Sequence, residues 1–249
     1  MPETKRSVSA EEKTLFLAKA RQAEAEARKA EAEAKKVLED AESARFQKLN
    51  IQLQYEENKR LTDTVLAGDN YQHIYRFSYD VNDVTSQVAI STLSRWSRQD
   101  PKCDMTFIIN SPGGSIIDGF AMYDFIQELK RKGHKITTVA SGYAASMGGV
   151  LLQAGTERVM GAESWLLVHE ASFRAGGKIG TVEDEVVFVK KMQAHILDIY
   201  ATRAAKKLRK DTPQGISAIR RNIEKGWKRT DWWLSAQEAL KNGFIDSIQ

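Results

Sequence analysis

The chain has 249 residues, of which 42% are hydrophobic and 28% charged, with a formal net charge of +4. That is enough material for one sizeable buried core with a further segment attached. The single cysteine excludes an internal disulfide, and no stretch is long and apolar enough to span a bilayer. The first residues lack the apolar block of a secretory signal, and basic residues alternate with acids. We therefore expect a cytoplasmic protein that binds neither membrane nor nucleic acid.

The N-terminal quarter has the composition of one long helix. From Ser9 to about Leu61 there is no proline or glycine, and Ala, Glu, Lys and Arg dominate. Ser9 and Glu12 have the spacing of a capping box. Two acid–base pairs stand four residues apart with the acid first, Glu24 with Arg28 and Glu31 with Lys35. Because sustained heptads are missing, a solvated helix or weak coiled coil is favoured over a dedicated partner-binding arm.

Beyond the break "LAGDN" the hydrophobic period changes, so we expect a helical extension over 1–66 and a second domain over 67–249. Short apolar runs alternate there with segments of helical period, which predicts an α/β domain with mainly parallel strands. The expected strands lie in "HIYRFSY", "MTFIIN", "KITTVA", "ERVM" and "SWLLVHE". The expected helices lie in "VTSQVAISTLSRWSRQ", "IIDGFAMYDFIQELKRKG", residues 181–209 and "LSAQEALKNGFID". Gly133 and Gly243 are expected to end helices, and Ser235 with Glu238 forms a second capping box.

The segment 181–209 is amphipathic. One face carries Val186, Val189, Met192, Ile196 and Ile199. That apolar face requires a partner surface.

Ligands of parallel α/β sheets bind at the carboxyl ends of strands, which here are the glycine-bearing turns "IINSPGG" and "VASGYAAS". Both turns run into helices, whose first N–H groups are free to bind an anion. The N–H groups of Gly114 and Met147 could therefore hold an oxyanion beside Ser146. The small residues around Ser146 could equally serve tight helix–strand packing, and this segment alone leaves the two interpretations even.

A serine nucleophile requires a base, and the chain has four histidines. His73 and His134 are expected to be solvated or loop histidines, and His195 a partly buried packing residue. His169 closes the apolar run "WLLV", although a structural role is the commoner one for such a residue. The third member of a triad is a carboxylate. Spacing cannot choose among Asp104, Asp118, Asp124, Asp184, Asp198 and Asp231.

Several strings occur together in one order: "INSPGGS", "AMYDFIQ", "GYAASMGGVLLQAG", "LLVHEAS" and "DWWLSAQEALKNGFID". Together they resemble the ClpP family, the proteolytic subunit of the Clp protease, over roughly Ile74 to Asp246. The resemblance implies a serine endopeptidase in which Ser146 is the nucleophile, His169 the general base and Asp231 the residue that orients it.

The same resemblance implies further site residues. Gly114 and Met147 would form the oxyanion hole. Substrate-binding positions would be Gly113, Ser115, Gly176 and Gly177, the last two in the glycine-rich strand of "RAGGKIG". No metal or organic cofactor is expected.

The resemblance also implies a crotonase-like fold of stacked ββα units, assembled as two stacked heptameric rings around a closed chamber. Residues 181–209 would be the handle helix that joins the rings. Such a chamber admits folded proteins only with an ATP-driven AAA+ unfoldase, and it would lie in the cytoplasm of a bacterial or phage-infected cell.

The chain departs from the family pattern at several positions. Thr230 stands in place of an arginine, Tyr143 in place of a glutamine, and "HEAS" in place of "HQP". The alanine-rich helix replaces the segment that lines the axial pore. We therefore expect that the chain does not pair with a host unfoldase in the ordinary way. Helical extensions of this kind are similar to those of phage-encoded members that cut scaffold and capsid proteins during head maturation.

Three other functions stay open at this stage. Acyl-CoA chemistry on the related crotonase fold also uses paired backbone N–H groups, but it does not need the serine and histidine together. A serine–lysine peptidase would make His169 replaceable. A catalytically silent ring or assembly subunit would retain the fold alone.

Overall fold

The computed structural model describes residues 9–228 and 231–249, and Thr230 lies outside them. The chain divides into two compact units, the first ending at Val65 and the second spanning Leu66–Gln249. Different interactions stabilise the two units.

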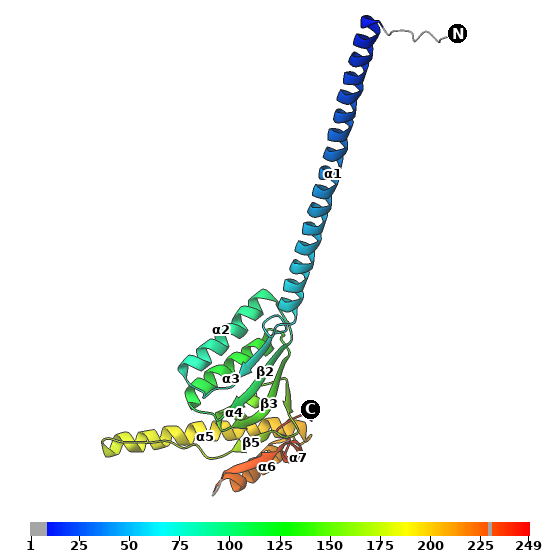
Figure 1. Ribbon diagram of the computed structural model, residues 1–249. Coiled ribbons are helices and arrows are strands. Elements are labelled where there is room, and N and C mark those ends of the chain that lie inside the picture. The colour runs from blue at the N-terminus through cyan, green and yellow to red at the C-terminus, as the bar shows by residue number, and fades with distance from the viewer. Residues whose placement is uncertain (1–8, 229–230) are drawn as a thin grey trace. The chain divides into compact units, whose positions relative to one another are not determined.

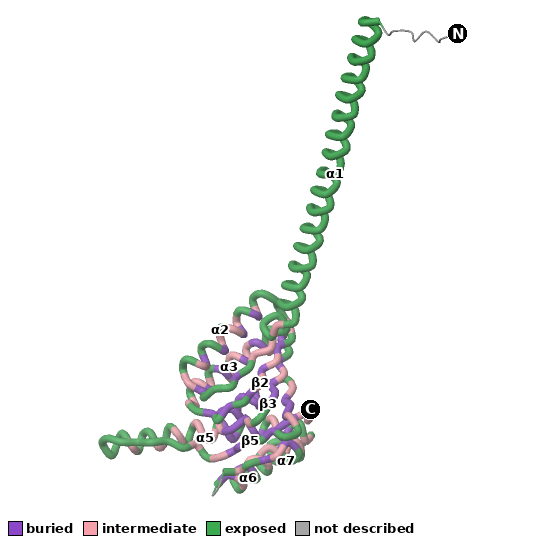
Figure 2. Tube along the Cα trace, in the orientation of Figure 1, coloured by how far each residue is buried: buried purple, intermediate pink, exposed green. Residues whose placement is uncertain are grey.

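The first unit is the predicted helix, α1, which runs unbroken over Ala10–Leu66 (Figure 1). The predicted capping box starts it: the Glu12 N–H donates to Ser9 Oγ at 3.1 Å, and the Ser9 N–H donates to Glu12 Oε2 at 2.9 Å. Ion pairs along the helix join Glu24 with Arg28 at 2.7 Å and Lys35 with Glu39, rather than Glu31, at 3.9 Å. No residue of α1 is buried (Figure 2). Composition and local pairing therefore support this helix, without a packed face.

The second unit is an α/β domain. Its strands are β1 Ile74–Phe77, β2 Met105–Ser111, β3 Ile136–Ala145, β4 Glu157–Met160, β5 Trp165–Val168, β6 Trp232–Ser235 and β7 Ser247–Ile248. Its helices are α2 Asp83–Gln99, α3 Ile116–Arg131, α4 Met147–Leu152, α5 Ile179–Lys207, α6 Pro213–Trp227 and α7 Ala236–Lys241. Parallel pairing joins β1-β2-β3-β4-β7, and β5 pairs with β3 in parallel and with β6 in antiparallel register. The predicted α/β class with mainly parallel strands is confirmed.

Alternating apolar side chains build the core on one face of the sheet. In β2 the side chains of Phe107 and Ile109 are buried, and Phe107 stacks on Phe77 of β1 with ring centroids 5.8 Å apart. Tyr75 of β1 also stacks on the Phe107 ring, with ring centroids 5.5 Å apart. Helices α2 and α3 cover the sheet with buried side chains that recur every three or four residues. In α2 these include Ala89, Leu93 and Trp96. This packing fixes the strand ends that carry the site.

The predicted helix ends are also present. Gly133 follows α3 with a φ of 97°, and Gly243 follows α7 with a φ of 76°, a conformation that favours glycine. At the start of α7 the Ser235 N–H donates to Glu238 Oε2 at 2.9 Å. The described residues contain no helix that meets the length and hydropathy of a membrane span.

Three elements were not predicted: α6, β6 and β7. The strand "KITTVA" is also longer than expected. It continues through Gly142 to Ala145, so the expected turn at "SGYAA" is replaced by strand that pairs with β2 and β5. This extension carries β3 directly to Ser146.

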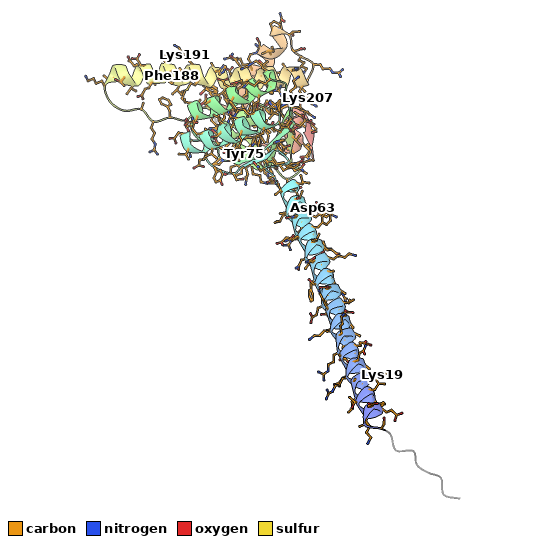
Figure 3. The ribbon with its side chains drawn as sticks, turned by 90° about the horizontal axis from the view of Figure 1, so that it is seen from above. Lys19, Asp63, Tyr75, Phe188, Lys191 and Lys207 are labelled. Atoms are coloured by element: carbon orange, nitrogen blue, oxygen red, sulfur yellow. The ribbon has the colours of Figure 1, made fainter. Side chains whose placement is uncertain are left out.

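The amphipathic helix α5 has two different halves. Ile196 and Ile199 of its second half are buried in the domain core. In the first half Val186 and Val189 are only partly buried, and Phe188 is 53% exposed (Figures 2 and 3). The expected apolar face therefore finds a partner within this chain over half its length only.

Candidate functional site

Ser146 joins the end of β3 to the first residue of α4. Its φ of 53° and ψ of −121° place it in a left-handed conformation that non-glycine residues rarely adopt. The Ser146 N–H donates to the Leu167 carbonyl of β5 at 3.0 Å, and its own carbonyl accepts from Gly149 at the same distance. Ser146 is partly exposed, whereas Ala145 and Met147 on either side are buried. The chain is thus held in a sharp elbow that presents one serine side chain, and such strain is typical of functional positions.

Gly113 and Gly114 bring a second backbone segment against this elbow. A Cβ on Gly113, whose φ is 92°, would lie 2.6 Å from the Ser146 Cβ and 2.8 Å from the Met147 nitrogen. A Cβ on Gly114 would lie 2.3 Å from the Val81 carbonyl oxygen. Only glycine permits this close approach at both positions.

The segment at Gly113 and Gly114 is also fixed by hydrogen bonds. The Val81 N–H donates to the Gly113 carbonyl, and the Ser115 N–H donates to the Val81 carbonyl, both at 2.8 Å. These bonds leave the Gly114 N–H unused, and Met147 is the first residue of α4, whose N–H has no intrahelical acceptor. Two backbone donors therefore lie beside Ser146.

A cavity of about 60 Å³ opens beside the elbow. Gly114, Ser146, Met147 and His169 line it together. Its apolar wall includes Ile116, Val150, Val168, Ile196, Tyr200 and Trp227. The structure therefore places the predicted serine, histidine and backbone donors around one small space that has an apolar wall.

His169 and Asp231 flank the antiparallel pair β5–β6. Val168, the last residue of β5, is the register partner of Trp232, the first residue of β6. His169 follows Val168 and Asp231 precedes Trp232, so continuing the register by one residue sets the two opposite each other. His169 is partly buried and Asp231 is exposed. In the described part of the chain, no hydrogen bond joins the side chains of Ser146, His169 and Asp231.

The other histidines are not among the residues that line this cavity. His134 lies in the loop before β3, as expected, but it is buried rather than solvated. Its Nε2 lies 2.8 Å from Ser97 Oγ, and its Nδ1 lies 3.0 Å from the Cys103 carbonyl oxygen. His73 packs its ring edge-on against Trp96. His195 is exposed rather than partly buried, with its ring against Phe120.

Some predicted binding residues stand outside the cavity lining. The Ser115 Oγ caps α3 by accepting from the Asp118 N–H at 3.4 Å. Gly176 and Gly177 are exposed, and a Cβ on either would have no atom within 4 Å. Residues 169–178 form a loop here rather than the expected glycine-rich strand.

Sequence reasoning missed the deeper wall of the cavity. The Tyr200 side chain is fully buried, burial raises the pKa of its hydroxyl far above the usual 10, and among the described residues that hydroxyl has no hydrogen-bond partner. Trp227 comes from the unpredicted α6. The helical period of Ile196 and Tyr200 shows that they face inward, but not which cavity they reach.

Comparisons with known proteins give a consistent result. A sequence model described as Clp protease matches residues 56–249. The ATP-dependent Clp protease proteolytic subunit 2 of Thermobifida fusca (strain YX) is 31% identical over 182 residues, which cover 71% of this chain and 80% of that protein. Proteolytic subunit 3 of Rhodococcus jostii (strain RHA1) is 33% identical over 171 residues, covering 68% and 77%. Proteolytic subunit 2 of Tropheryma whipplei (strain Twist) is 35% identical over 152 residues, covering 60% and 76%.

Proposed function

Because the chain belongs to the Clp protease family, we propose that it is a serine-type endopeptidase that hydrolyses peptide bonds through Ser146, His169 and Asp231. The observation that carries this proposal is the strained elbow at Ser146, which faces the same cavity as His169. The position of Asp231 across the β5–β6 pair from His169 supports the third role.

In this mechanism Ser146 Oγ attacks the carbonyl carbon of the scissile bond while the His169 imidazole removes its proton. His169 then donates that proton to the leaving amine, and a water molecule hydrolyses the acyl-enzyme by the same route. Asp231 fixes the tautomer of the imidazole and stabilises its positive charge. Hydrogen bonds of this kind are often long in an unliganded site and tighten when substrate binds.

The N–H groups of Gly114 and Met147 would hold the oxygen that becomes negative in the tetrahedral intermediate. The geometry supports this role of the two N–H groups, because Gly113 allows the two backbone segments to pass within van der Waals contact at Ser146. Losing one such donor costs about 3 kcal/mol of transition-state stabilisation. Gly113, Ser115, Gly176 and Gly177 would bind the substrate backbone on either side of the scissile bond.

We also propose that the active form is an oligomeric ring that encloses the cavity. The first half of α5 supports this, because Phe188 and Val187 are 53% and 52% exposed on a helix that requires a covering surface. A second copy of the same helix would supply that surface. No metal or organic cofactor enters the proposed mechanism.

The proposed substrates are peptides and proteins in the cytoplasm of a bacterial or phage-infected cell. The relatives are named as ATP-dependent, whereas this chain has the helix α1 where the family resemblance leads us to expect a pore-lining segment. We therefore propose that an AAA+ unfoldase does not stimulate this chain in the ordinary way, and that scaffold or capsid proteins of a phage are alternative substrates. Addition of a Clp ATPase to a folded substrate tests this, and stimulated degradation would contradict it.

A fluorophosphonate probe tests the proposed nucleophile directly. Wild-type protein should be labelled. The Ser146→Ala variant should not be labelled, and its rate of peptide cleavage should fall by about 10³-fold or more. The matched control is Ser217→Ala, which changes an exposed serine on α6. Equal labelling of Ser146→Ala would exclude Ser146 as the nucleophile. Activity that survives His169→Ala would indicate a lysine base, and an inert wild-type ring would indicate a silent subunit.

A further inference from the structure

A second group of reactive side chains gathers at the opposite ends of the strands from Ser146. Among the described residues, His73, Asp100 and Cys103 bring one ring nitrogen, one carboxylate oxygen and one sulfur within 4.8 Å of one another. His73 immediately precedes β1, Asp100 follows α2, and Cys103 lies in the loop before β2. Three different elements therefore converge on one point, and none of the three residues belongs to the proposed triad.

The backbone of this cluster is fixed by the sheet and by a turn. The Thr106 N–H of β2 donates to the His73 carbonyl at 2.9 Å, which continues the parallel pairing of β1 with β2. The Cys103 N–H donates to the Asp100 carbonyl at 3.3 Å. The three side chains are thus attached to backbone that is already positioned.

Two residues at the cluster hold left-handed backbone conformations. His73 has a φ of 53°, and Lys102, next to Cys103, has a φ of 66°. The His73 ring is kept in place by the edge of Trp96, with centroids 5.4 Å apart. Such conformations persist only where the surroundings determine them. The packing therefore holds the imidazole toward the loop that carries Asp100 and Cys103.

His134 supports the cysteine from behind. Its Nδ1 lies 3.0 Å from the Cys103 carbonyl oxygen and 3.6 Å from Cys103 Sγ. Because a carbonyl only accepts, Nδ1 carries the proton, and Nε2 accepts from the Ser97 hydroxyl at 2.8 Å. Hydrogen-bonded residues of this kind commonly orient the ligands of a metal site.

The charge of the cluster favours a cation. The Asp100 carboxylate brings a negative charge to within 4.8 Å of the His73 ring nitrogen and the Cys103 sulfur. A thiol that coordinates a divalent cation loses its proton outright and adds a second negative charge.

We propose that His73, Asp100 and Cys103 bind one transition-metal ion of the zinc class. Imidazole nitrogen, carboxylate oxygen and thiolate sulfur are all zinc ligands, with bonds of about 2.0–2.3 Å. Around a tetrahedral ion such bonds put ligand atoms about 3.3–3.8 Å apart, so small side-chain rotations bring atoms within 4.8 Å into range. The fourth position is left for water.

The bound ion would tie the segment that precedes β1 to the loop between α2 and β2. An ion that binds the folded state alone raises the stability of that state as its concentration exceeds Kd. The existence of this site does not depend on the peptidase proposed above.

Cobalt provides a direct probe of this site in the full-length protein. After treatment with a chelator, wild-type protein should bind Co²⁺ at one equivalent with an ultraviolet thiolate-to-cobalt charge-transfer band, and Zn²⁺ should displace it. Cys103→Ser should lose the band. His73→Gln and Asp100→Asn should each weaken binding by at least about 10-fold, as loss of a contact to the metal does.

Two control variants test whether Co²⁺ binding is specific to this cluster. His195→Gln, which changes an exposed histidine on α5, should bind Co²⁺ as the wild type does. Ser146→Ala should do the same, so failure of the peptidase proposal leaves this result intact. Circular dichroism verifies that each variant folds. Absence of the band in wild type, or unchanged affinity in either His73→Gln or Asp100→Asn, would overturn the site.

Discussion

Val168 of β5 and Trp232 of β6 face each other as the outermost register pair of an antiparallel ladder. Continuing this register by one residue would place Asp231 opposite His169. This register joins residues more than 60 positions apart in the sequence. This backbone pairing supports Asp231, which the family resemblance selects, as the third member of the proposed triad.

Asp231→Asn tests the role that this register suggests. The amide keeps the shape of the carboxylate but cannot hold the His169 tautomer that accepts the serine proton, so kcat should fall by about 10³–10⁴-fold. Steady-state peptide cleavage measures the change. Asp211→Asn, at an exposed position between α5 and α6, is the matched control and should retain wild-type kcat. A loss smaller than 10-fold in Asp231→Asn would remove this residue from the mechanism.

The left-handed backbone of Ser146 predicts an unusual stability order. Because glycine adopts a φ of 53° without strain, Ser146→Gly should be more stable to unfolding than Ser146→Ala by about 1 kcal/mol. Both variants should be inactive. Urea denaturation followed by circular dichroism measures the difference.

The control for this order is Ser91, at an exposed position in the middle of α2. There alanine should exceed glycine in stability by about 1 kcal/mol, since glycine weakens a helix interior. If glycine were also the less stable substitution at Ser146, the elbow would carry no strain.

Local sequence patterns were sufficient for much of the fold. The capping residues of α1 and α7 and the glycine that ends α3 act on neighbours within a turn, so their spacing alone predicted them. The helix α6 had such a signal too. Thr212 caps it, Pro213 begins it, and Ile219, Ile223 and Trp227 recur every four residues.

The missing parts depend on contacts between distant segments. The four residues of β6 form a strand because they pair with β5, and β7 because it pairs with β4. The burial of His134 depends on Ser97 and Cys103 from other elements. For the same reason spacing could place Ser146 at a strand end but could not select Asp231. That selection came from the family resemblance and stays a prediction.

The ion pair between Arg158 and Asp246 predicts sensitivity to acid. Arg158 is 1% exposed, and its guanidinium donates to Asp246 Oδ1 at 2.7 Å and Oδ2 at 3.0 Å. Burial acts to raise the pKa of Asp246, but the hydrogen bonds and charge of Arg158 outweigh it and hold the pKa below the ordinary 3.8. The unfolded chain therefore binds this proton first as pH falls. The contribution to stability is present above about pH 4 and is lost as the pH falls through the lowered value.

Asp246→Asn should cost about 3 kcal/mol of unfolding free energy at neutral pH, because Arg158 stays buried without its counter-charge. The variant should also show a shallower loss of stability than wild type below about pH 4. Chemical denaturation at several pH values measures both effects. Glu128→Gln removes one charge from an exposed pair with Lys132 and should change stability far less. Equal effects of the two substitutions would show that the buried pair contributes no more than a surface pair.

The hydroxyl of Tyr200 predicts a gain in stability on its removal. It is fully buried against the cavity wall, and within the described residues it has no hydrogen-bond partner. A buried polar group without a partner costs about 1–3 kcal/mol, whereas the aromatic ring packs well without it. Tyr200→Phe should therefore raise the free energy of unfolding by about 1 kcal/mol.

The comparison for Tyr200 is Tyr79→Phe, where the ring is 59% exposed and water satisfies the hydroxyl. That change should leave the unfolding free energy within about 0.5 kcal/mol of wild type. Urea denaturation of both variants under the same conditions gives the difference. A destabilised Tyr200→Phe would mean that the hydroxyl has a partner in the assembled protein, and the most direct source of such a partner is a water molecule or substrate group in the cavity beside Ser146.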